Sequence, residues 1–279
     1  MSRLFMRLIV LVVLFSVLPA QVCAKPGDLD SASIRNAQVY LDSLWSIYDN
    51  IPIDSARAVS RMRMLLDNWS ELTKPDTSRL PTDAGICEQV FSDIFKARYY
   101  PDPKTGRKRP FQSKLKPYVV LRDSIRYAVI TDTALWQVLS GRRGDSRLRS
   151  RIRYYELQYQ HIAPQLDVSS TVLRFDPARY EAVNAFINGR RNISATNERT
   201  PDLQRRFDWL NSYFSVCFSH GGEHYPLSTL PIIGTILLNG DMTEAVVVMN
   251  WACYSGETIL CRKSDGIWTR VSSYDHWDV

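Results

Sequence analysis

Apolar side chains recur every three or four residues in the early part of the chain, which is the period of an amphipathic helix. Two such stripes occupy residues 33–49 and 53–72, with Pro52 between them, and predict a helical hairpin. A third stripe, at 86–99, predicts another helix after the loop 73–85. The apolar positions of the stripes are Val39, Leu41, Leu44, Trp45, Ile47 and Tyr48; Ala58, Met62, Leu65, Leu66 and Trp69; and Val90, Phe91, Ile94 and Phe95.

The pattern changes after residue 117, where strands and short helices alternate. Residues 118–131 predict a strand or a strand pair bent near Arg122 and Asp123, and 147–160 predict another extended segment. Two helices have clear signals: one from the cap Asp132 to Gly141, and one from Asp176 to a stop at 189. Pro201 opens a last helix, whose apolar face is predicted to continue to residue 217.

The last fifty residues predict four consecutive antiparallel strands. Asn-Gly at 239–240, Ser-Gly at 255–256 and Asp-Gly at 265–266 separate four apolar runs, and such pairs are strong hairpin signals. Two-residue turns at 255–256 and 265–266 would align Trp251, Leu260 and Val271 in one row, which we assign to the core. The same register would put Cys253 and Cys261 on opposite faces.

Together these elements predict an α+β fold: an N-terminal helical hairpin followed by helices packed on a curved antiparallel sheet with a C-terminal four-stranded meander. A helix before a meander ending in "DGIW" resembles the NTF2-like and cystatin-like α+β domains of secreted bacterial proteins of unknown function. The resemblance covers about residues 201–279 and rests on the order of elements. It implies a sheet that wraps a pocket, and it transfers no catalytic residue to this chain.

The N-terminus predicts export. A basic start containing Arg3 and Arg7 precedes an apolar run at 8–18, and small residues lead to cleavage after Ala24. Cys23 would suit a lipoprotein, but the residues before it do not form the usual lipobox. We therefore expect a signal peptide at 1–24, an N-terminal helical region at 25–80 and an α+β domain at 81–279, in the periplasm, at the cell surface or outside the cell. No later segment is apolar enough to span a membrane.

Charge is unevenly distributed. Residues 96–153 contain sixteen Lys and Arg but only four acidic residues, a net of +12, which leaves −8 on the rest of the mature chain. The four arginines Arg147, Arg149, Arg151 and Arg153 are two residues apart, so a strand would present them on one face. That face could bind a polyanion such as lipopolysaccharide or an acidic glycan, or it could be a solvated face that protects an edge strand. Nucleic acid is not an expected partner outside the cytoplasm.

Four cysteines remain after cleavage: Cys87, Cys217, Cys253 and Cys261. They permit two disulfides, or they could be buried free thiols.

The stretch 220–224 raises the question of catalysis, because it reads His-Gly-Gly-Glu-His and matches a zinc-protease pattern. A zinc site needs both histidines on one helix face, whereas two glycines and Pro226 are typical of a helix end. We therefore expect no metal or other cofactor, although a loop site of His220, Glu223 and His224, with His276, remains an alternative.

A thiol mechanism would use Cys217, which the pattern places on an apolar helix face. The sequence favours a non-enzymatic binding or structural role, and the alternative is a metal- or thiol-dependent hydrolase that uses the segment 217–224.

Overall fold

The protein is described by a computed structural model, which covers residues 29–53, 55–73, 75, 82–99, 116–122, 124–141, 152–158, 162–164, 170–195, 202–218, 227–229, 232–252 and 255–278. The helices in this part of the chain are α2 (Ser31–Asn50), α3 (Ala56–Leu72), α4 (Thr82–Tyr99), α5 (Thr133–Ser140), α7 (Pro177–Ile187) and α8 (Leu203–Asn211). The strands are β1 (Tyr118–Arg122), β2 (Ser124–Ile130), β3 (Tyr155–Gln158), β4 (Thr171–Phe175), β5 (Val216–Phe218), β6 (Leu227–Thr229), β7 (Ile232–Asn239), β8 (Glu244–Ala252), β9 (Ser255–Ser264) and β10 (Ile267–Asp278).

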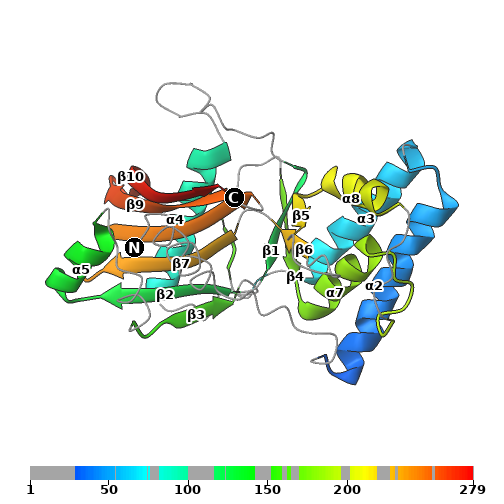
Figure 1. Ribbon diagram of the computed structural model, residues 1–279, viewed down its shortest axis with the longest axis horizontal. Coiled ribbons are helices and arrows are strands. Elements are labelled where there is room, and N and C mark those ends of the chain that lie inside the picture. Colours follow the sequence, from blue (N-terminus) through cyan, green and yellow to red (C-terminus); the bar gives the residue numbers. More distant parts are fainter. Residues whose placement is uncertain are drawn as a thin grey trace, which may run out of the picture.

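These elements surround three hydrophobic clusters, two large and one small (Figure 1); the small one lies between α5 and the six-stranded sheet. We call the first the helical core; α2, α3, α7 and α8 form most of it. We call the second the sheet core; it lies between α4 and the six-stranded sheet. The predicted α+β fold class is therefore confirmed, and so are the two helices of the N-terminal region.

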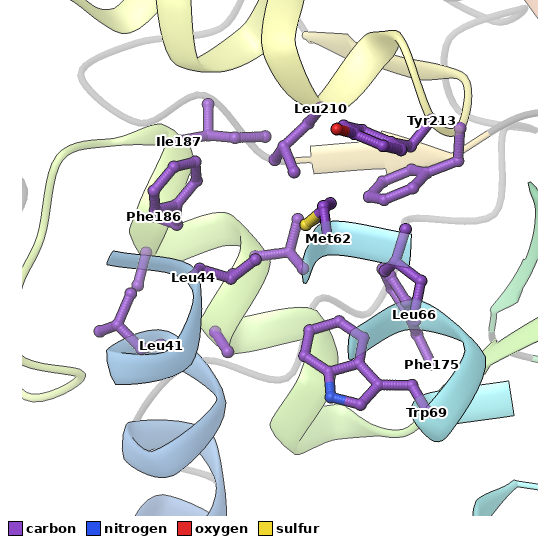
Figure 2. Packing of buried hydrophobic residues seen from close by; sticks show 14 of the residues in the cluster. Leu41, Leu44, Met62, Leu66, Trp69, Phe175, Phe186, Ile187, Leu210 and Tyr213 are labelled. Carbon is purple, nitrogen blue, oxygen red and sulfur yellow. The ribbon is translucent and has the colours of Figure 1, made fainter. Parts of the chain in front are cut away.

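Long apolar side chains from helices far apart in the sequence fill the helical core (Figure 2). Leu41 and Leu44 of α2 meet Phe186 of α7, while Met62 and Leu66 of α3 lie nearby, and all five are fully buried. Burial of each such side chain stabilises the fold by about 1.5–3 kcal/mol before the entropy cost of ordering it. The helices are thus held by their shared interior rather than by helix propensity alone.

The strand pair β1 and β4 forms the wall between the two cores. The pair is parallel, and its side chains alternate between the two sides. Tyr118 and Val120 enter the helical core, whereas Val119 and Leu121 enter the sheet core. The predicted break near Asp123 is confirmed, because β1 ends at Arg122 and β2 joins a different sheet.

The large sheet has the strand order β10-β9-β8-β7-β2-β3 and is open. Strands β7 to β10 form the predicted antiparallel meander, and β2 joins β7 in parallel, so the sheet is mixed rather than antiparallel throughout. The helix α4 covers one face and α5 covers part of the other.

Local signals account for several boundaries. The side chains of Asp132 and Asp176 accept hydrogen bonds from the backbone N–H groups of Leu135 and Arg179 and so cap α5 and α7. Asp265 and Gly266 have φ of 52° and 78°, as the two central residues of a type I′ hairpin turn require.

The register predicted for the meander is wrong. Leu260 pairs with Val246 and Ser272, because a bulge at Val271 shifts the β10 register by one residue. Val271 is therefore 48% exposed. The side chain of Trp251 lies outside the described residues. The true core face carries Ala245, Val247 and Met249 of β8, Ile259 and Cys261 of β9, and Trp268 of β10.

The turn predicted at 255–256 is wrong as well. Ser255 pairs with Ala252 and Gly256 pairs with Asn250, so both lie inside β9. The glycine marks an irregularity in the ladder, where the register shifts between Asn250 and Ala252, and not a turn.

The helix predicted to continue to residue 217 is too long. The helix α8 ends at Asn211, and Val216–Phe218 form β5, which pairs with β6. Within the described residues, no helix is both long enough and apolar enough to cross a membrane.

Candidate functional site

Of the four arginines in the predicted basic row, the structure describes one, Arg153. Arg147, Arg149 and Arg151 lie outside the described residues, and Arg153 is exposed two residues before β3 begins. Part of the predicted extended segment is therefore a strand, β3, but Arg153 itself is not in it.

Arg153 lines a cavity of about 600 Å³. The cavity lies where β3 stops pairing with β2. The last pair is Tyr127 with Tyr155, and Val129 and Ile130 of β2 have no partner in β3. Leu135 of α5 adds an apolar wall. Its size falls in the range of roughly 300–1,000 Å³ found for small-molecule sites.

Two carboxylates also line this cavity, Asp83 and Asp132. Both have structural partners: Asp132 accepts a hydrogen bond from the Leu135 N–H at 3.0 Å, and Asp83 accepts one from the Ala84 N–H at 3.0 Å. Burial and, after it, the charge of the nearby Asp83 carboxylate raise the pKa of Tyr127 to about 12. With one arginine and two aspartates, the cavity itself is not a concentrated cationic site.

An arginine–aromatic surface lies beside the cavity. The Arg126 guanidinium is 5.3 Å from the centre of the Tyr154 ring, and the Tyr127 and Tyr155 rings are 5.6 Å apart. Tyr155 is 53% exposed, so this surface is open to solvent. Guanidinium groups held over rings are suited to anionic and planar partners.

Sequence reasoning did not bring these residues together. It identified Asp132 only as a helix cap, and it did not single out Asp83. The two aspartates are 49 positions apart in the sequence (83 and 132), one in α4 and the other just before α5. No local spacing marks such a pair.

The segment of the zinc-protease pattern lies outside the described residues, and with it His220, Glu223 and His224. The side chains of Cys217 and His276 lie outside them too. The interpretation of this segment as a helix end is wrong, because the element before it is the strand β5, not α8. The segment joins β5 to its antiparallel partner β6. Among the described residues, no group of three or more His, Cys, Asp or Glu side chains could hold a metal ion.

Two of the cysteines are described, and both are free and buried in the sheet core. Burial raises the pKa of the Cys87 thiol far above its usual range and that of Cys261 to about 12. Both thiols are therefore protonated at neutral pH and serve as apolar filling rather than as nucleophiles.

Comparisons of the chain with protein-family models, with curated proteins and with solved structures found no match.

Proposed function

We propose that this is an exported, non-enzymatic binding protein that contacts a polyanion through the basic segment 96–153. The observation that carries the proposal is the charge imbalance: this segment has a net charge of +12, and the rest of the mature chain has −8. A surface of one sign attracts ligands of the other over about a Debye length, roughly 8–10 Å in physiological salt.

Lysine and arginine side chains of the basic segment that form no ion pair within the protein support this proposal. The ion pairs between described residues are Arg179–Asp176, Arg190–Glu181, Arg191–Asp49, Arg262–Glu244 and Arg270–Glu257, all outside the segment. Within the described part of the segment, Lys96, Lys116, Arg126 and Arg153 form no ion pair of this kind. Their charge therefore remains available to an external anion.

The chemistry of the described cavity also favours binding over catalysis. Its two aspartates accept hydrogen bonds from the backbone N–H groups of Leu135 and Ala84, and the two described thiols lie outside it in the sheet core, where burial raises their pKa values. The arginines and the exposed tyrosine around β3 are suited to binding an anionic ligand, because a guanidinium can form paired hydrogen bonds with phosphate or carboxylate groups.

The test is retention on immobilised heparin and on lipopolysaccharide as a function of salt. Replacing Arg147, Arg149, Arg151 and Arg153 by Ser should lower the eluting salt concentration on the ligand that binds. A matched control replaces Arg35, Arg57, Arg61 and Lys263, which removes the same charge elsewhere. Equal retention of the two variants would mean that binding depends only on the net charge of the protein, and it would overturn the proposed site. Unchanged melting temperatures would show that both variants fold.

A further inference from the structure

The cavity beside β3 is lined by more than positive charge. Besides Arg153, its lining includes the carboxylates of Asp83 and Asp132 and the ring of Tyr155. Two carboxylates repel a ligand that is anionic along its whole length, such as a chain of phosphate groups. They attract hydroxyl groups, because a carboxylate accepts charge-assisted hydrogen bonds from O–H donors. The lining therefore favours a ligand in which many hydroxyls accompany a few acidic groups.

The cavity lies across the edge of the sheet. Asp83 belongs to α4 and Asp132 immediately precedes α5, and these helices cover opposite faces of the sheet. Between them, Val129 and Ile130 extend β2 beyond its last pair with β3. A ligand in the cavity can therefore contact both carboxylates at once.

Both carboxylates are oriented before a ligand arrives. Asp132 accepts the Leu135 N–H through Oδ1 at 3.0 Å. Asp83 accepts the Ala84 N–H through Oδ1 at 3.0 Å and is also hydrogen-bonded to Tyr127. A carboxylate has about four acceptor positions on its two oxygens. Asp132 is exposed, and no hydrogen bond or ion pair with another described residue occupies its Oδ2, so it is the more open acceptor of the two.

Tyr155 gives the cavity a flat apolar side. It is 53% exposed, and the Tyr127 ring packs against it with ring centres 5.6 Å apart. Leu135 and Ile152 add aliphatic surface to the lining. A sugar ring has C–H groups on its faces and hydroxyls around its edge, so one face can cover an aromatic ring while the hydroxyls reach polar partners. Tyr155 and the carboxylates thus match the two kinds of surface on one sugar unit.

Arg153 supplies a partner for an acidic group on that sugar. It is exposed and takes part in no ion pair between described residues. A guanidinium and a carboxylate can form two parallel hydrogen bonds. The cavity volume of about 600 Å³ lies in the range of small-molecule sites, which leaves room for a sugar unit of a longer chain.

We propose that the polyanion bound by this protein is an acidic glycan, and that the cavity beside β3 binds one of its uronic acid units. The sugar ring would cover Tyr155, and its carboxylate would pair with Arg153. Its hydroxyls would donate hydrogen bonds to Asp132 and Asp83. The inference rests on the proposed function and narrows its ligand, because phosphate groups on their own gain nothing from the two aspartates.

The test compares ligands of matched length on the unaltered mature protein by isothermal titration calorimetry at low salt. The ligands are hexasaccharides of galacturonate, mannuronate and glucuronate, the methyl esters of these hexasaccharides, and a linear hexaphosphate. At least one acidic hexasaccharide should bind at least about tenfold more tightly than hexaphosphate, as additional charge-assisted hydrogen bonds imply. Its methyl ester should bind at least about tenfold more weakly than the acid, because the ester has no carboxylate to pair with Arg153.

Substitutions in the cavity separate the sugar contacts from the charge. Tyr155→Ala should weaken binding of that hexasaccharide at least about tenfold and leave hexaphosphate unchanged, whereas Tyr155→Phe keeps the ring and should bind both as before. Asp132→Ser keeps a cap for α5 but loses a carboxylate acceptor, so it should weaken the hexasaccharide and not the hexaphosphate. Asp30→Ser removes the same charge at the cap of α2, outside the cavity, and should leave both unchanged.

The outcomes separate this inference from polyanion binding. Equal binding of acidic hexasaccharides and hexaphosphate, or an equal loss of both in Tyr155→Ala, would overturn the glycan assignment and leave polyanion binding in place. Equal binding of acid and ester, or equal losses in Asp132→Ser and Asp30→Ser, would overturn the assigned contacts. If no acidic ligand binds at low salt, the proposed function fails together with this inference. Unchanged melting temperatures show that the variants fold, and the comparison of ligands needs no variant.

Discussion

The helical core and the sheet core differ in how much charge they bury. Around the helical core, Arg179, Glu181, Arg190 and Arg206 are each no more than 5% exposed. Around the sheet core, the buried residues with a formal charge in the described part of the chain are Glu257 and Arg174, and Arg174 lies at its edge on β4. The two cores thus differ in the number of charged side chains that they bury, although both are filled with large apolar side chains.

The ends of the helices explain the difference. The last carbonyls of a helix have no partner within it, and a helix end packed in the interior needs a donor from elsewhere. Arg206 donates to the Ile187 carbonyl at 3.0 Å, at the end of α7. On the sheet side of the β1–β4 wall, Arg174 donates to the Ile162 carbonyl at 2.6 Å and also to the Thr73 carbonyl, just after α3, at 3.3 Å. The sheet satisfies its backbone through its own ladder, so its core can remain nearly free of charge.

The largest effect should follow from breaking the buried pair of Glu181 and Arg190, whose side chains are 3% and 4% exposed. Arg190→Met leaves the carboxylate buried without its cation, and should lower the free energy of unfolding by about 3–5 kcal/mol. The double variant Glu181→Leu/Arg190→Met should recover much of this loss. Urea unfolding measures the free energy of unfolding of both variants. A double variant no more stable than Arg190→Met would contradict the prediction, because it would show that apolar side chains cannot replace the ion pair.

A smaller loss is expected from Arg206→Met. The substitution keeps an apolar stem but removes the donor to the Ile187 carbonyl, and an unpaired buried acceptor costs about 1–3 kcal/mol. The neighbouring Arg205 is exposed and lies 5.8 Å from the Tyr48 ring, so Arg205→Met should cost less than about 1 kcal/mol. Equal losses would mean that helix-end carbonyls do not explain the buried arginines.

Sequence patterns could predict the parts of the fold that depend on local signals. The caps Asp132 and Asp176 and the turn at Asp265 are encoded within a few residues, and all three are found as expected. The buried arginines could not be predicted this way. Arg206 lies among polar residues of α8, and its acceptor at residue 187 is 19 positions away and belongs to another helix.

The errors have the same origin. Tyr213 and Phe214 continue the helical spacing of α8, but β5 is fixed by its pairing with β6, more than ten residues later. The bulge at Val271 has no signal in the sequence of β10. The candidate site depends on such long-range contacts too, because Asp83 and Arg153 line one cavity although they are far apart in the sequence.

The junction of the two cores predicts a pH dependence. Burial raises the pKa of Glu88 on α4 above its ordinary value of 4.5, and the Ala163 N–H and the Arg174 charge only partly oppose this. Between the ordinary and the raised pKa, the folded protein binds more protons at this site than the unfolded chain. Its contribution to stability is therefore lost as pH rises through that range. Glu88→Gln should flatten this part of the profile, measured by urea unfolding between about pH 4 and 7; an unchanged slope would show that Glu88 does not titrate differently in the fold.

The smallest effect concerns the sheet core and its register. Val271 lies at the bulge and is 48% exposed, whereas Ile259 is 3% exposed and faces α4. Val271→Ala should change the free energy of unfolding by no more than about 0.5 kcal/mol, as exposed substitutions generally do. Ile259→Val removes one buried methyl group and should cost about 0.5–1.5 kcal/mol. Since Val271→Ala deletes more carbon than Ile259→Val, the reverse order of losses could not come from size. That order would mean that Val271 is buried in the core and that Leu260 lies opposite Val271, without a bulge. The residues assigned here to the sheet core would then be wrong, and the comparison of its buried charge with that of the helical core would fail.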